Sequence, residues 1–379
     1  MKKLIRVTTS DISLELLLKG QLRFLSQYYE VVGVSANTGL LSGVAKREGI
    51  RTIELSMRRE ISLRRDLACL LHLIWMFRRE RPFIVHANTP KGSLLAMMAA
   101  MVCRVPHRLY TVTGLRYQGA EGMGRKLLKT MERITCFCAT KVIPEGKGVR
   151  HTLLADHITS KPLKVIHYGN INGIDTSHFS EEACPKSRQE VRRTLGIDDD
   201  IFTFVFIGRI VRDKGMDELA TAMIRLLNAG YRCSLILVGW FENEQDRITE
   251  DHENFFKYSE HVKYVGYQKD VRPYLAAADA LVFPSYREGF PHVPLEAGAM
   301  GLPAIVTDIN GCNEIVIDGV NGRIIPPRQA EALYDMMARF MENPDEVASM
   351  ASKARSMITD RYEHDDVMQA LLKMYQELG

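Results

Sequence analysis

The stretch from residue 285 to residue 300 reads SYREGFPHVPLEAGAM. It follows an apolar run that is typical of a buried strand, its glycine and prolines break the chain, and helix-forming residues return from Leu295. In an open α/β sheet, ligands bind at the carboxyl ends of the parallel strands, where a helix N-terminus offers free backbone N–H groups to an anion. The stretch therefore predicts an α/β fold and places a ligand site within it.

Two glutamates of this stretch, Glu288 and Glu296, stand eight positions apart. We expect Glu288 in the loop, facing a ligand, and Glu296 about two turns further on, at the head of the helix. For an isolated pair of glutamates, solvated positions on a loop and on a helix face would be the better interpretation. The rest of the chain supports the first interpretation.

The whole chain repeats the same alternation of strand and helix. Short β-rich apolar runs alternate with amphipathic helical stretches, which predicts parallel sheets that are covered by helices on both faces. The pattern pauses over residues 169–188, which are rich in Gly, Asn, Ser and Pro and typical of a linker. A chain of 379 residues suits two domains. We therefore predict two doubly wound domains with a ligand cleft between them.

Composition narrows the class of protein. With 46% hydrophobic and 25% charged residues, the chain is typical of a soluble globular protein. Its seven cysteines show no disulfide-framework spacing, which favours a reducing compartment. No run reaches the ~18 apolar residues that a membrane span requires. The N-terminal segment is interrupted by Arg6 and Asp11, so we interpret it as a first strand and not as a signal peptide.

The charge is divided unevenly between the two halves. Residues 1–180 hold 28 Lys+Arg against 13 Asp+Glu, a balance of +15, and residues 181–379 hold 22 against 33, a balance of −11. A basic half attracts nucleic acid or an anionic membrane surface. The segments Leu63–Arg79 and Gly124–Cys138 mix basic and apolar residues, as interfacial helices do. Alternatively, they are amphipathic helices that cover a sheet and expose a solvated basic face.

Of these possible partners, nucleic acid has the least support from the sequence. The chain has no zinc-finger spacing, no RNA-recognition signature and no long run of Lys or Arg. We therefore expect no nucleic-acid partner. Between the other two interpretations, the sequence by itself leaves the choice open.

A second signature, FIGRIVRDKGMDEL, opens the second half of the chain at residue 206. We expect a buried strand to end at Ile207 and Gly208 to allow a tight turn. Arg209 and Lys214 then emerge just before a helix. Two cations beside a helix N-terminus suit a diphosphate, which needs charge neutralisation and several hydrogen-bond donors.

Other nucleotide and metal sites are disfavoured. Neither a G-x-x-x-x-G-K-[ST] loop nor a G-x-G-x-x-G loop occurs, which argues against a P-loop ATPase and the usual dinucleotide site. Three aspartates at 198–200 precede the strand, which is the wrong end for a ligand. We expect a solvated loop there and no metal site.

Taken together, these segments resemble family 4 of the retaining glycosyltransferases. The resemblance covers the whole second domain, and the two acids lie inside the expected EGFPxxxLEAxAxGxP frame. The first domain resembles the family more loosely, through VHANTPKGSLLA, YTVTGLRY and NGIDTSHF. The segments of the second domain are GRIVRDKG at Gly208, LVG at Leu237–Gly239, the run from Val265 to Asp308, and NEIVIDGVNGRIIPP at Asn313–Pro327.

This resemblance implies a GT-B architecture, in which two Rossmann-like doubly wound domains face a central cleft. Residues 1–172 would form the N-terminal, acceptor-binding domain, and residues 173–361 the domain that binds the nucleotide-sugar donor. Residues 362–379 would form a C-terminal helix that crosses back onto the first domain. No cofactor is expected besides the donor substrate, and catalysis would be independent of metal ions.

The family's functional residues map onto the two motifs. Arg209 and Lys214 would bind the donor's diphosphate, Glu288 the hydroxyls of the transferred sugar, and Glu296 the ribose. Arg209, Lys214 and the helix terminus would stabilise the departing nucleoside diphosphate, and these two cations together with Glu288 are the predicted catalytic residues. Backbone N–H groups of the loop would hold sugar and phosphates, and His292 would line the donor pocket at most. The predicted donor-binding set is Gly208, Arg209, Lys214, Glu288, Gly289, Phe290, Pro291, Leu295 and Glu296.

One position departs from the family. Many relatives have a histidine in a first-domain loop where this chain has Thr113, and a hydroxyl cannot replace imidazole as a base. His86 is a candidate substitute, although a hydrogen-bonded buried imidazole is an equal alternative. The predicted first-domain site residues are His86, Asn88, Thr89, Lys91, Thr113 and Gly114.

The resemblance and the basic first half lead to a functional hypothesis. We expect transfer of a hexose or N-acetylhexosamine from a UDP-sugar to a polyprenyl-diphosphate-linked glycan, in capsule, O-antigen or exopolysaccharide biosynthesis. The enzyme would be cytoplasmic and peripheral, at the inner face of the cell membrane. A non-hydrolysing UDP-sugar epimerase of the same architecture and a catalytically silent nucleotide-sugar-binding partner remain open.

Overall fold

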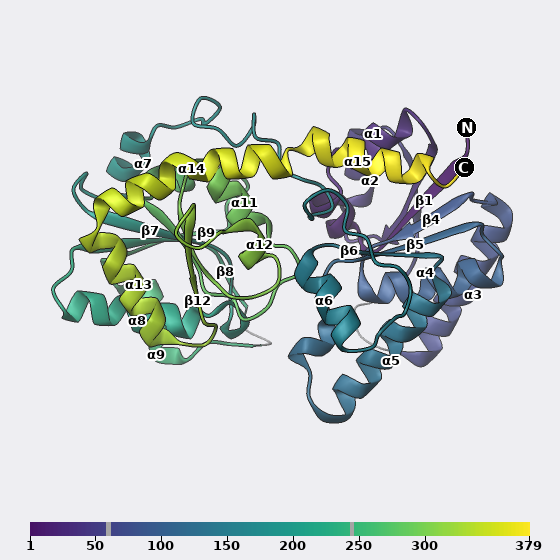
Figure 1. Ribbon diagram of the computed structural model, residues 1–379, viewed down its shortest axis with the longest axis horizontal. Coiled ribbons are helices and arrows are strands. Elements are labelled where there is room, and N and C mark those ends of the chain that lie inside the picture. Colours follow the sequence, from purple (N-terminus) through teal and green to yellow (C-terminus); the bar gives the residue numbers. More distant parts are fainter. Residues whose placement is uncertain (58–61, 243–245) are drawn as a thin grey trace. The chain divides into compact units, whose positions relative to one another are not determined.

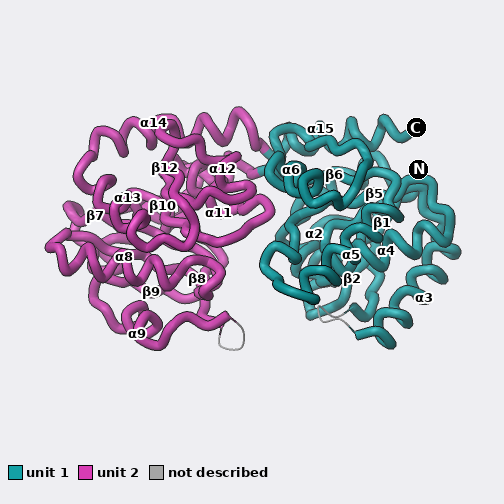
Figure 2. The backbone as a smooth tube through the Cα atoms, turned by 60° about the horizontal axis from the view of Figure 1, so that its bottom comes forward, with its two compact units in different colours: residues 1–173, 364–379 teal, residues 174–363 magenta. Residues whose placement is uncertain are grey.

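The computed structural model describes residues 1–57, 62–242 and 246–379 (Figure 1). They form two compact units, unit 1 with residues 1–173 and 364–379, and unit 2 with residues 174–363 (Figure 2). The sequence predicted the divisions after residues 172 and 361. Each unit is built on a six-stranded parallel sheet with helices on both faces, so the predicted fold class is confirmed.

The sheet of unit 1 has the order β3-β2-β1-β4-β5-β6. Its inner strands are buried because both faces of the sheet are covered, and all four residues of β4 are buried, whereas the edge strand β3 is partly exposed. The strands are β1 (Lys3–Ser10), β2 (Glu30–Ala36), β3 (Arg51–Glu54), β4 (Ile84–Ala87), β5 (His107–Val112) and β6 (Lys141–Pro144).

The helices of unit 1 divide between two apolar clusters. One cluster packs α3, α4, α5 and α6 onto the sheet, and the other packs α1, α2 and α15. These helices are α1 (Gln21–Ser26), α2 (Leu41–Glu48), α3 (Leu63–Glu80), α4 (Pro90–Val102), α5 (Gly122–Cys138), α6 (Lys147–Ala155) and α15 (His364–Gln376), together with the short turns η1 (Ser13–Leu17) and η2 (Arg116–Gly119).

Unit 2 repeats the plan with the strand order β12-β11-β10-β7-β8-β9 around one large apolar core. Its strands are β7 (Phe202–Ile210), β8 (Cys233–Phe241), β9 (Val262–Gly266), β10 (Ala280–Phe283), β11 (Ala304–Thr307) and β12 (Gly322–Ile325). Its helices are α7 (Arg188–Leu195), η3 (Arg212–Lys214), α8 (Met216–Asn228), α9 (Glu250–Tyr258), α10 (Arg272–Ala277), α11 (His292–Ala299), α12 (Cys312–Ile315), α13 (Ala330–Glu342) and α14 (Pro344–Tyr362).

The last helix belongs to unit 1, although the chain reaches it from unit 2. Helix α14 ends at Tyr362 and α15 begins at His364. Leu371, Leu372 and Tyr375 of α15 are buried against the sheet of unit 1. The C-terminal segment therefore contributes part of the core of the first domain.

Two stretches of unit 1 depart from their apolar pattern. Residues 163–168 have the apolar pattern of a strand but form only a single bridge, between Leu163 and Val142. Residues 14–28 have the pattern of one helix but are divided, because Gly20 takes a left-handed conformation (φ 80°) between η1 and α1. Among the helices that the structure describes, none combines the length and apolar composition that crossing a bilayer requires.

Candidate active site

The sheet of unit 2 reverses its winding between β7 and β10. These strands are neighbours, but the chain continues from β7 to β8 on one side and from β10 to β11 on the other. In open α/β sheets, ligands bind at such a switch point, at the carboxyl ends of the strands. Arg209 lies at the end of β7, Lys214 follows that strand, and Glu288 follows β10. The fold thus brings the predicted catalytic residues to the place where a ligand is expected.

Gly208 does not form the turn that the sequence predicted. Strand β7 continues through it to Ile210, in register with β8. Gly208 is opposite Gly239, and a Cβ on Gly239 would lie only 1.8 Å from the carbonyl oxygen of Gly208. Both glycines also have positive φ, 153° and 146°. Gly239 therefore permits the two backbones to approach closely at Gly208, and the turn comes later, at η3.

Gly215 joins the two halves of the site. It has φ 71° at the start of α8, and a Cβ there would lie 2.1 Å from the carbonyl oxygen of Pro284. Only glycine permits this approach, because any side chain would strike the backbone after β10. The contact holds the segment that carries Lys214 against the segment that carries Glu288.

Lys214 and Glu288 form a direct ion pair. The Lys214 Nζ donates to Glu288 Oε1, and Ser285 Oγ donates to the same oxygen at 2.9 Å. Both side chains are mostly buried, with 18% and 17% of their surface exposed. A partly exposed ammonium and a partly exposed carboxylate therefore stand together at the switch point, one suited to a phosphate and the other to hydroxyl groups.

Arg209 lies at the outer edge of the site. Its Nη1 is 2.5 Å from Glu242 Oε2, and the two side chains are 45% and 34% exposed. Exposed ion pairs contribute at most about 1 kcal/mol because water and salt screen them. Arg209 can therefore leave Glu242 for a ligand phosphate at little cost.

Helix α11 begins three residues earlier than predicted, at His292, with Pro291 at its N-cap. The side chains of Phe290 and Leu295 are buried in the core of unit 2, so these two residues could reach a ligand only through their backbone. Gly289 and Pro291 lie in the loop that leads into the helix. The early start places Glu296 in the second turn of α11.

Glu296 carries the most perturbed carboxyl group of this site. Glu296 is partly buried, and this burial raises the pKa of its carboxyl group to about 7. Within the described parts of the chain, the carboxyl group makes no hydrogen bond to another side chain. A buried acid of this kind is suited to a ligand that donates hydrogen bonds, such as a pair of sugar hydroxyls.

The sequence undervalued His292, at the first position of α11. Its Nε2 is buried without a hydrogen-bond partner in the described residues, and burial lowers the pKa of the imidazole. A neutral imidazole with one unused ring nitrogen faces a cost of burial that a ligand group could relieve. Nothing in the sequence distinguishes it from an ordinary loop histidine.

The first-domain candidates lie at the corresponding switch point of unit 1, between β1 and β4. Thr89 Oγ1 accepts a hydrogen bond from the backbone N–H of Thr9 at 2.8 Å. Thr113 Oγ1 donates to the carbonyl oxygen of Asn88 at 2.9 Å, and Gly114 follows it in the same loop. Lys91 is buried, with its Nζ 2.5 Å from Asp66 Oδ1. The hydroxyl of Thr113 thus ties two strand ends together.

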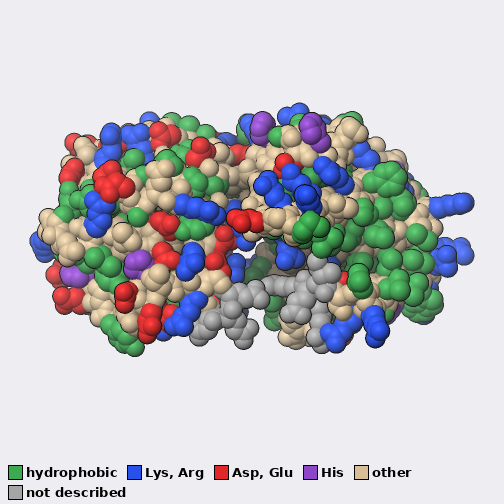
Figure 3. All heavy atoms as spheres, turned by 90° about the horizontal axis from the view of Figure 1, so that it is seen from below, with side chains coloured by type: hydrophobic (Ala, Val, Ile, Leu, Met, Phe, Trp, Pro, Cys, Tyr) green, Lys and Arg blue, Asp and Glu red, His purple; other side chains and the backbone are tan. Residues whose placement is uncertain are grey.

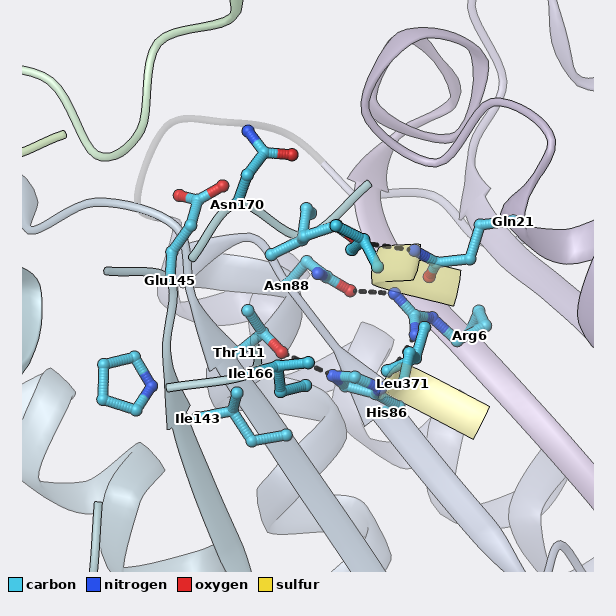
Figure 4. Close-up of a pocket in the computed structure, with 13 residues that line it drawn as sticks. Arg6, Gln21, His86, Asn88, Thr111, Ile143, Glu145, Ile166, Asn170 and Leu371 are labelled. Atoms are coloured by element: carbon cyan, nitrogen blue, oxygen red, sulfur yellow. Dashed lines mark hydrogen bonds between the residues drawn. The ribbon is translucent and has the colours of Figure 1, made fainter. Parts of the chain in front are cut away.

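His86 is buried and hydrogen-bonded at both ring nitrogens (Figure 4). Its Nδ1 is 2.8 Å from Arg6 Nη1 and 2.5 Å from the Tyr375 hydroxyl, and its Nε2 is 2.7 Å from Thr111 Oγ1. Burial, and then the charge of Arg6, hold its pKa well below the usual value. The structure therefore favours the alternative of a hydrogen-bonded buried imidazole over a catalytic base.

Arg6 is the residue of unit 1 that the sequence did not single out. Its guanidinium is buried, donates to Asn88 Oδ1 at 2.7 Å and to the Tyr375 hydroxyl at 2.7 Å, and belongs to none of the ion pairs described. The adjoining cavity has about 10 Å³, enough for one water molecule (Figure 4). Arg6 Nε and Asn88 Nδ2 are buried there without a protein partner in the described residues.

A larger cavity of unit 2 is a poor candidate for the site. It has about 440 Å³ and is lined by Phe202, Asp279 and Pro303 among others. These residues lie at the amino ends of β7, β10 and β11, opposite to the end where ligands bind in this fold. The cavity therefore does not compete with the switch point.

The chain matches two models of known families. Residues 187–357 match "Glycosyl transferases group 1", and residues 26–169 match "Glycosyl transferase 4-like domain". Together they cover most of both units, and each model falls within one unit.

Individual relatives agree with these models. A capsular polysaccharide biosynthesis glycosyltransferase, CapM of Staphylococcus aureus, is 28% identical over 375 residues, which cover 99% of this chain and 97% of the relative. A second relative is the UDP-Gal:alpha-D-GlcNAc-diphosphoundecaprenol alpha-1,3-galactosyltransferase of Escherichia coli. It is 26% identical over 299 residues, which cover 78% of this chain and 75% of the relative.

The fold has solved counterparts as well. Anabaena HepE, solved in complex with UDP, superimposes with a TM-score of 0.81 over 100% of both chains at 20% identity. At this identity the likeness shows the fold alone, which is the GT-B arrangement of two Rossmann-like domains. The predicted family is thus confirmed by both domains, and the chain belongs to the group 1 glycosyltransferases with a 4-like first domain and a GT-B fold.

Proposed function

We propose that the protein transfers a hexose or N-acetylhexosamine from a UDP-sugar to a polyprenyl-diphosphate-linked glycan, with retention of configuration, in surface polysaccharide biosynthesis. The observation that carries this proposal is the Lys214–Glu288 pair at the switch point of unit 2. In a glycosyltransferase of this family, a cation beside a carboxylate at that place suits a sugar diphosphate.

The donor's diphosphate binds to Lys214 and Arg209 in this proposal. Lys214 is held in place by its segment and by Glu288, whereas Arg209 moves from Glu242 onto the phosphates. Both cations then stabilise the negative charge that develops on the departing UDP, so no metal ion is required. The Anabaena neighbour of the same fold was solved with UDP and with UDP-glucose, which supports a uridine donor.

The sugar and the ribose bind to the two glutamates. Glu288, once Lys214 turns to the phosphates, accepts hydrogen bonds from hydroxyls of the transferred sugar, and Ser285 keeps its carboxylate oriented. Glu296 accepts from the ribose hydroxyls, which supply the partners that its carboxyl group lacks in the described chain. Backbone N–H groups from Gly289 onward hold the remaining oxygens.

The acceptor follows from the relatives and from the charge of the first half. The Escherichia coli relative is named for a diphosphoundecaprenol-linked acceptor and the Staphylococcus aureus relative for capsule synthesis. Residues 1–180 carry a balance of +15, which suits an anionic membrane surface where such acceptors reside. The protein then works as a peripheral enzyme at the cytoplasmic face of the membrane.

The test is a transfer assay with a panel of UDP-sugars and a polyprenyl-diphosphate-linked N-acetylhexosamine as acceptor. We expect one UDP-sugar to give a lipid-linked disaccharide whose new linkage keeps the anomeric configuration of the donor, as read by NMR. Conversion of a UDP-sugar without acceptor would indicate an epimerase instead. Binding of UDP-sugars without any turnover would indicate a silent binding partner.

A further inference from the structure

Helix α3 exposes a stripe of large apolar side chains. Leu63, Leu67, Leu71 and Trp75 follow one another at intervals of four residues, and 84%, 58%, 59% and 56% of their surfaces are exposed. Residues four apart lie on the same side of a helix. The opposite side of α3 is already buried in the core of unit 1, so this stripe is a second apolar face.

Helix α5 has a matching stripe. Met123, Leu127, Ile134 and Phe137 are spaced by four, seven and three residues along one side of the helix, and 79%, 52%, 40% and 72% of their surfaces are exposed. A helix that covers a sheet in water normally places polar residues on its outer side. Two helices that break this rule in the same unit indicate a surface with an apolar partner.

The two stripes lie on one side of unit 1. Helices α3 and α5 both pack against α4, which lies between them on the same face of the sheet. Figure 3 looks onto this side of the molecule and shows hydrophobic side chains gathered over unit 1, with Lys and Arg at their margin. We call the eight exposed apolar residues of α3 and α5 the apolar surface.

Exposed basic residues predominate along the two described helices of the apolar surface, with one exposed acid, Glu121, at the N-cap of α5. The acids of the two helices are Asp66, Glu80 and Glu132, and each is hydrogen-bonded or ion-paired within the protein. By contrast, none of the described ion pairs uses the exposed basic residues of these helices, and one of them, Arg79, lies over the Trp75 ring at 5.5 Å. Those without a described ion pair include Arg64, Arg65, Arg78, Arg79, Arg125 and Lys126.

We propose that the apolar surface inserts into the interface of an anionic lipid bilayer, with the basic residues of α3 and α5 on the lipid headgroups. This inference rests on the proposed function, because a lipid-linked acceptor would lie in that bilayer. Interfacial helices combine an apolar face with flanking Lys and Arg in this way, and they bury that face by roughly 5–10 Å.

A second copy of the chain fits the surface less well. A symmetric dimer would bring the same patch of both copies together, and with it the unpaired arginines and lysines of both. Like charges at close range oppose such a contact, whereas anionic headgroups attract them. Trp75 also favours the bilayer, because tryptophan prefers the level of the headgroups.

Trp75 provides a direct probe of insertion. The chain has two tryptophans, and Trp240 lies in unit 2, so the variant Trp240→Phe leaves Trp75 as the only one. We expect the fluorescence of this variant to shift to shorter wavelength with vesicles of phosphatidylglycerol and phosphatidylcholine at low salt. An unchanged spectrum at saturating vesicle concentration would overturn the inference.

Variants of the stripes separate insertion from simple charge attraction. The pairs Leu67→Gln with Leu71→Gln, and Leu127→Gln with Phe137→Gln, alter exposed positions without changing the net charge and should melt at the temperature of the wild type. We expect each pair to weaken vesicle binding by at least about tenfold, because each removes two apolar side chains from the lipid. The matched control is Tyr258→Gln in unit 2, a side chain that is 81% exposed and should have no effect. Vesicle binding equal to that of the wild type in both pairs would show attraction by charge alone.

Two further measurements keep this inference distinct from the proposed function. With a short-chain, water-soluble acceptor, the stripe variants should transfer sugar at the rate of the wild type. If neither the wild type nor any variant transferred sugar, the proposed function would be contradicted. Insertion into the bilayer would still be tested by vesicle binding. Light scattering would overturn the proposal of bilayer insertion if it showed a dimer that the stripe variants convert to a monomer. The apolar surface would then be a surface of self-association.

Discussion

The ammonium group of Lys214 donates to the carboxylate of Glu288 across 74 positions of sequence. The two residues meet because β7 and β10 are neighbours at the switch point of their sheet and because Gly215 lets α8 approach the end of β10. In the proposed function, the cation of this pair binds the diphosphate of the donor and the anion binds its sugar. The ligand would then replace one internal ion pair by two new contacts.

Lys214→Ala should reduce transfer by a factor of roughly 10² to 10³ in kcat, because it removes a group that stabilises the departing diphosphate. The melting temperature should change little, since Glu288 keeps its hydrogen bond from Ser285. The measurement is steady-state transfer with the preferred donor, together with a thermal melt. The matched control is Arg232→Ala, which removes an exposed ion pair with Asp200 and should leave the rate unchanged. Transfer at the rate of the wild type in Lys214→Ala would remove this residue from the mechanism.

Glu288→Gln should affect sugar transfer without weakening the binding of the nucleotide. The amide keeps the shape of the side chain but leaves Lys214 without its anion, so UDP alone should bind at least as tightly as to the wild type. Transfer should nevertheless fall by about 10²-fold, because the acceptor for the sugar hydroxyls is weakened. Calorimetry with UDP and transfer kinetics check the two halves. Parallel losses in both would place Glu288 on the nucleotide instead.

UDP affinity should rise with pH through about 7, the value to which burial raises the pKa of Glu296. Only the ionised carboxyl group accepts hydrogen bonds from both ribose hydroxyls, so binding favours loss of its proton. Titration calorimetry in buffers of different ionisation enthalpy should detect proton release at pH 6 to 7. The variant Glu296→Gln should bind more weakly and lose this pH dependence. A pH dependence that persists in Glu296→Gln would assign the proton to another group.

The same group affects the stability of the unliganded protein in the opposite direction. Because the pKa of Glu296 is raised by folding, the folded state binds the proton more tightly than the unfolded chain. The contribution of Glu296 to stability is therefore complete below its ordinary pKa and is lost as pH rises through about 7. Glu296→Gln should flatten this part of the curve of unfolding free energy against pH.

His86→Ala should destabilise unit 1 and not act on proton transfer. Loss of the ring leaves Arg6 and Thr111 with unmet hydrogen bonds in the core, which costs roughly 2 to 4 kcal/mol. The pKa of His86 is lowered by folding, so its contribution to stability is lost as pH falls below its ordinary value. Denaturant unfolding at pH 7.5 and pH 5.5 checks both points. A catalytic defect in His86→Gln at unchanged stability would restore the role of base.

The sequence predicted the plan of both sheets because buried parallel strands are continuous apolar runs and their helices are amphipathic. It failed where a residue depends on a distant partner. The role of Gly208 is set by Gly239 of the next strand, and the environment of His86 by Tyr375, 289 positions away. Arg6, a charge inside an apolar strand, gives no signal of the polar network that surrounds it. Lys214 and Glu288 were identified through the family motif, and the topology explains why they meet.

The most direct test of the donor site is the affinity of UDP for the wild type and for Lys214→Ala, measured by titration calorimetry under the same salt conditions. We expect saturable binding by the wild type and at least about tenfold weaker binding by Lys214→Ala, because a charge-assisted contact to the diphosphate is lost. Equal affinity of the two proteins for UDP would contradict the assignment of Lys214, and with it the donor site at the switch point of unit 2.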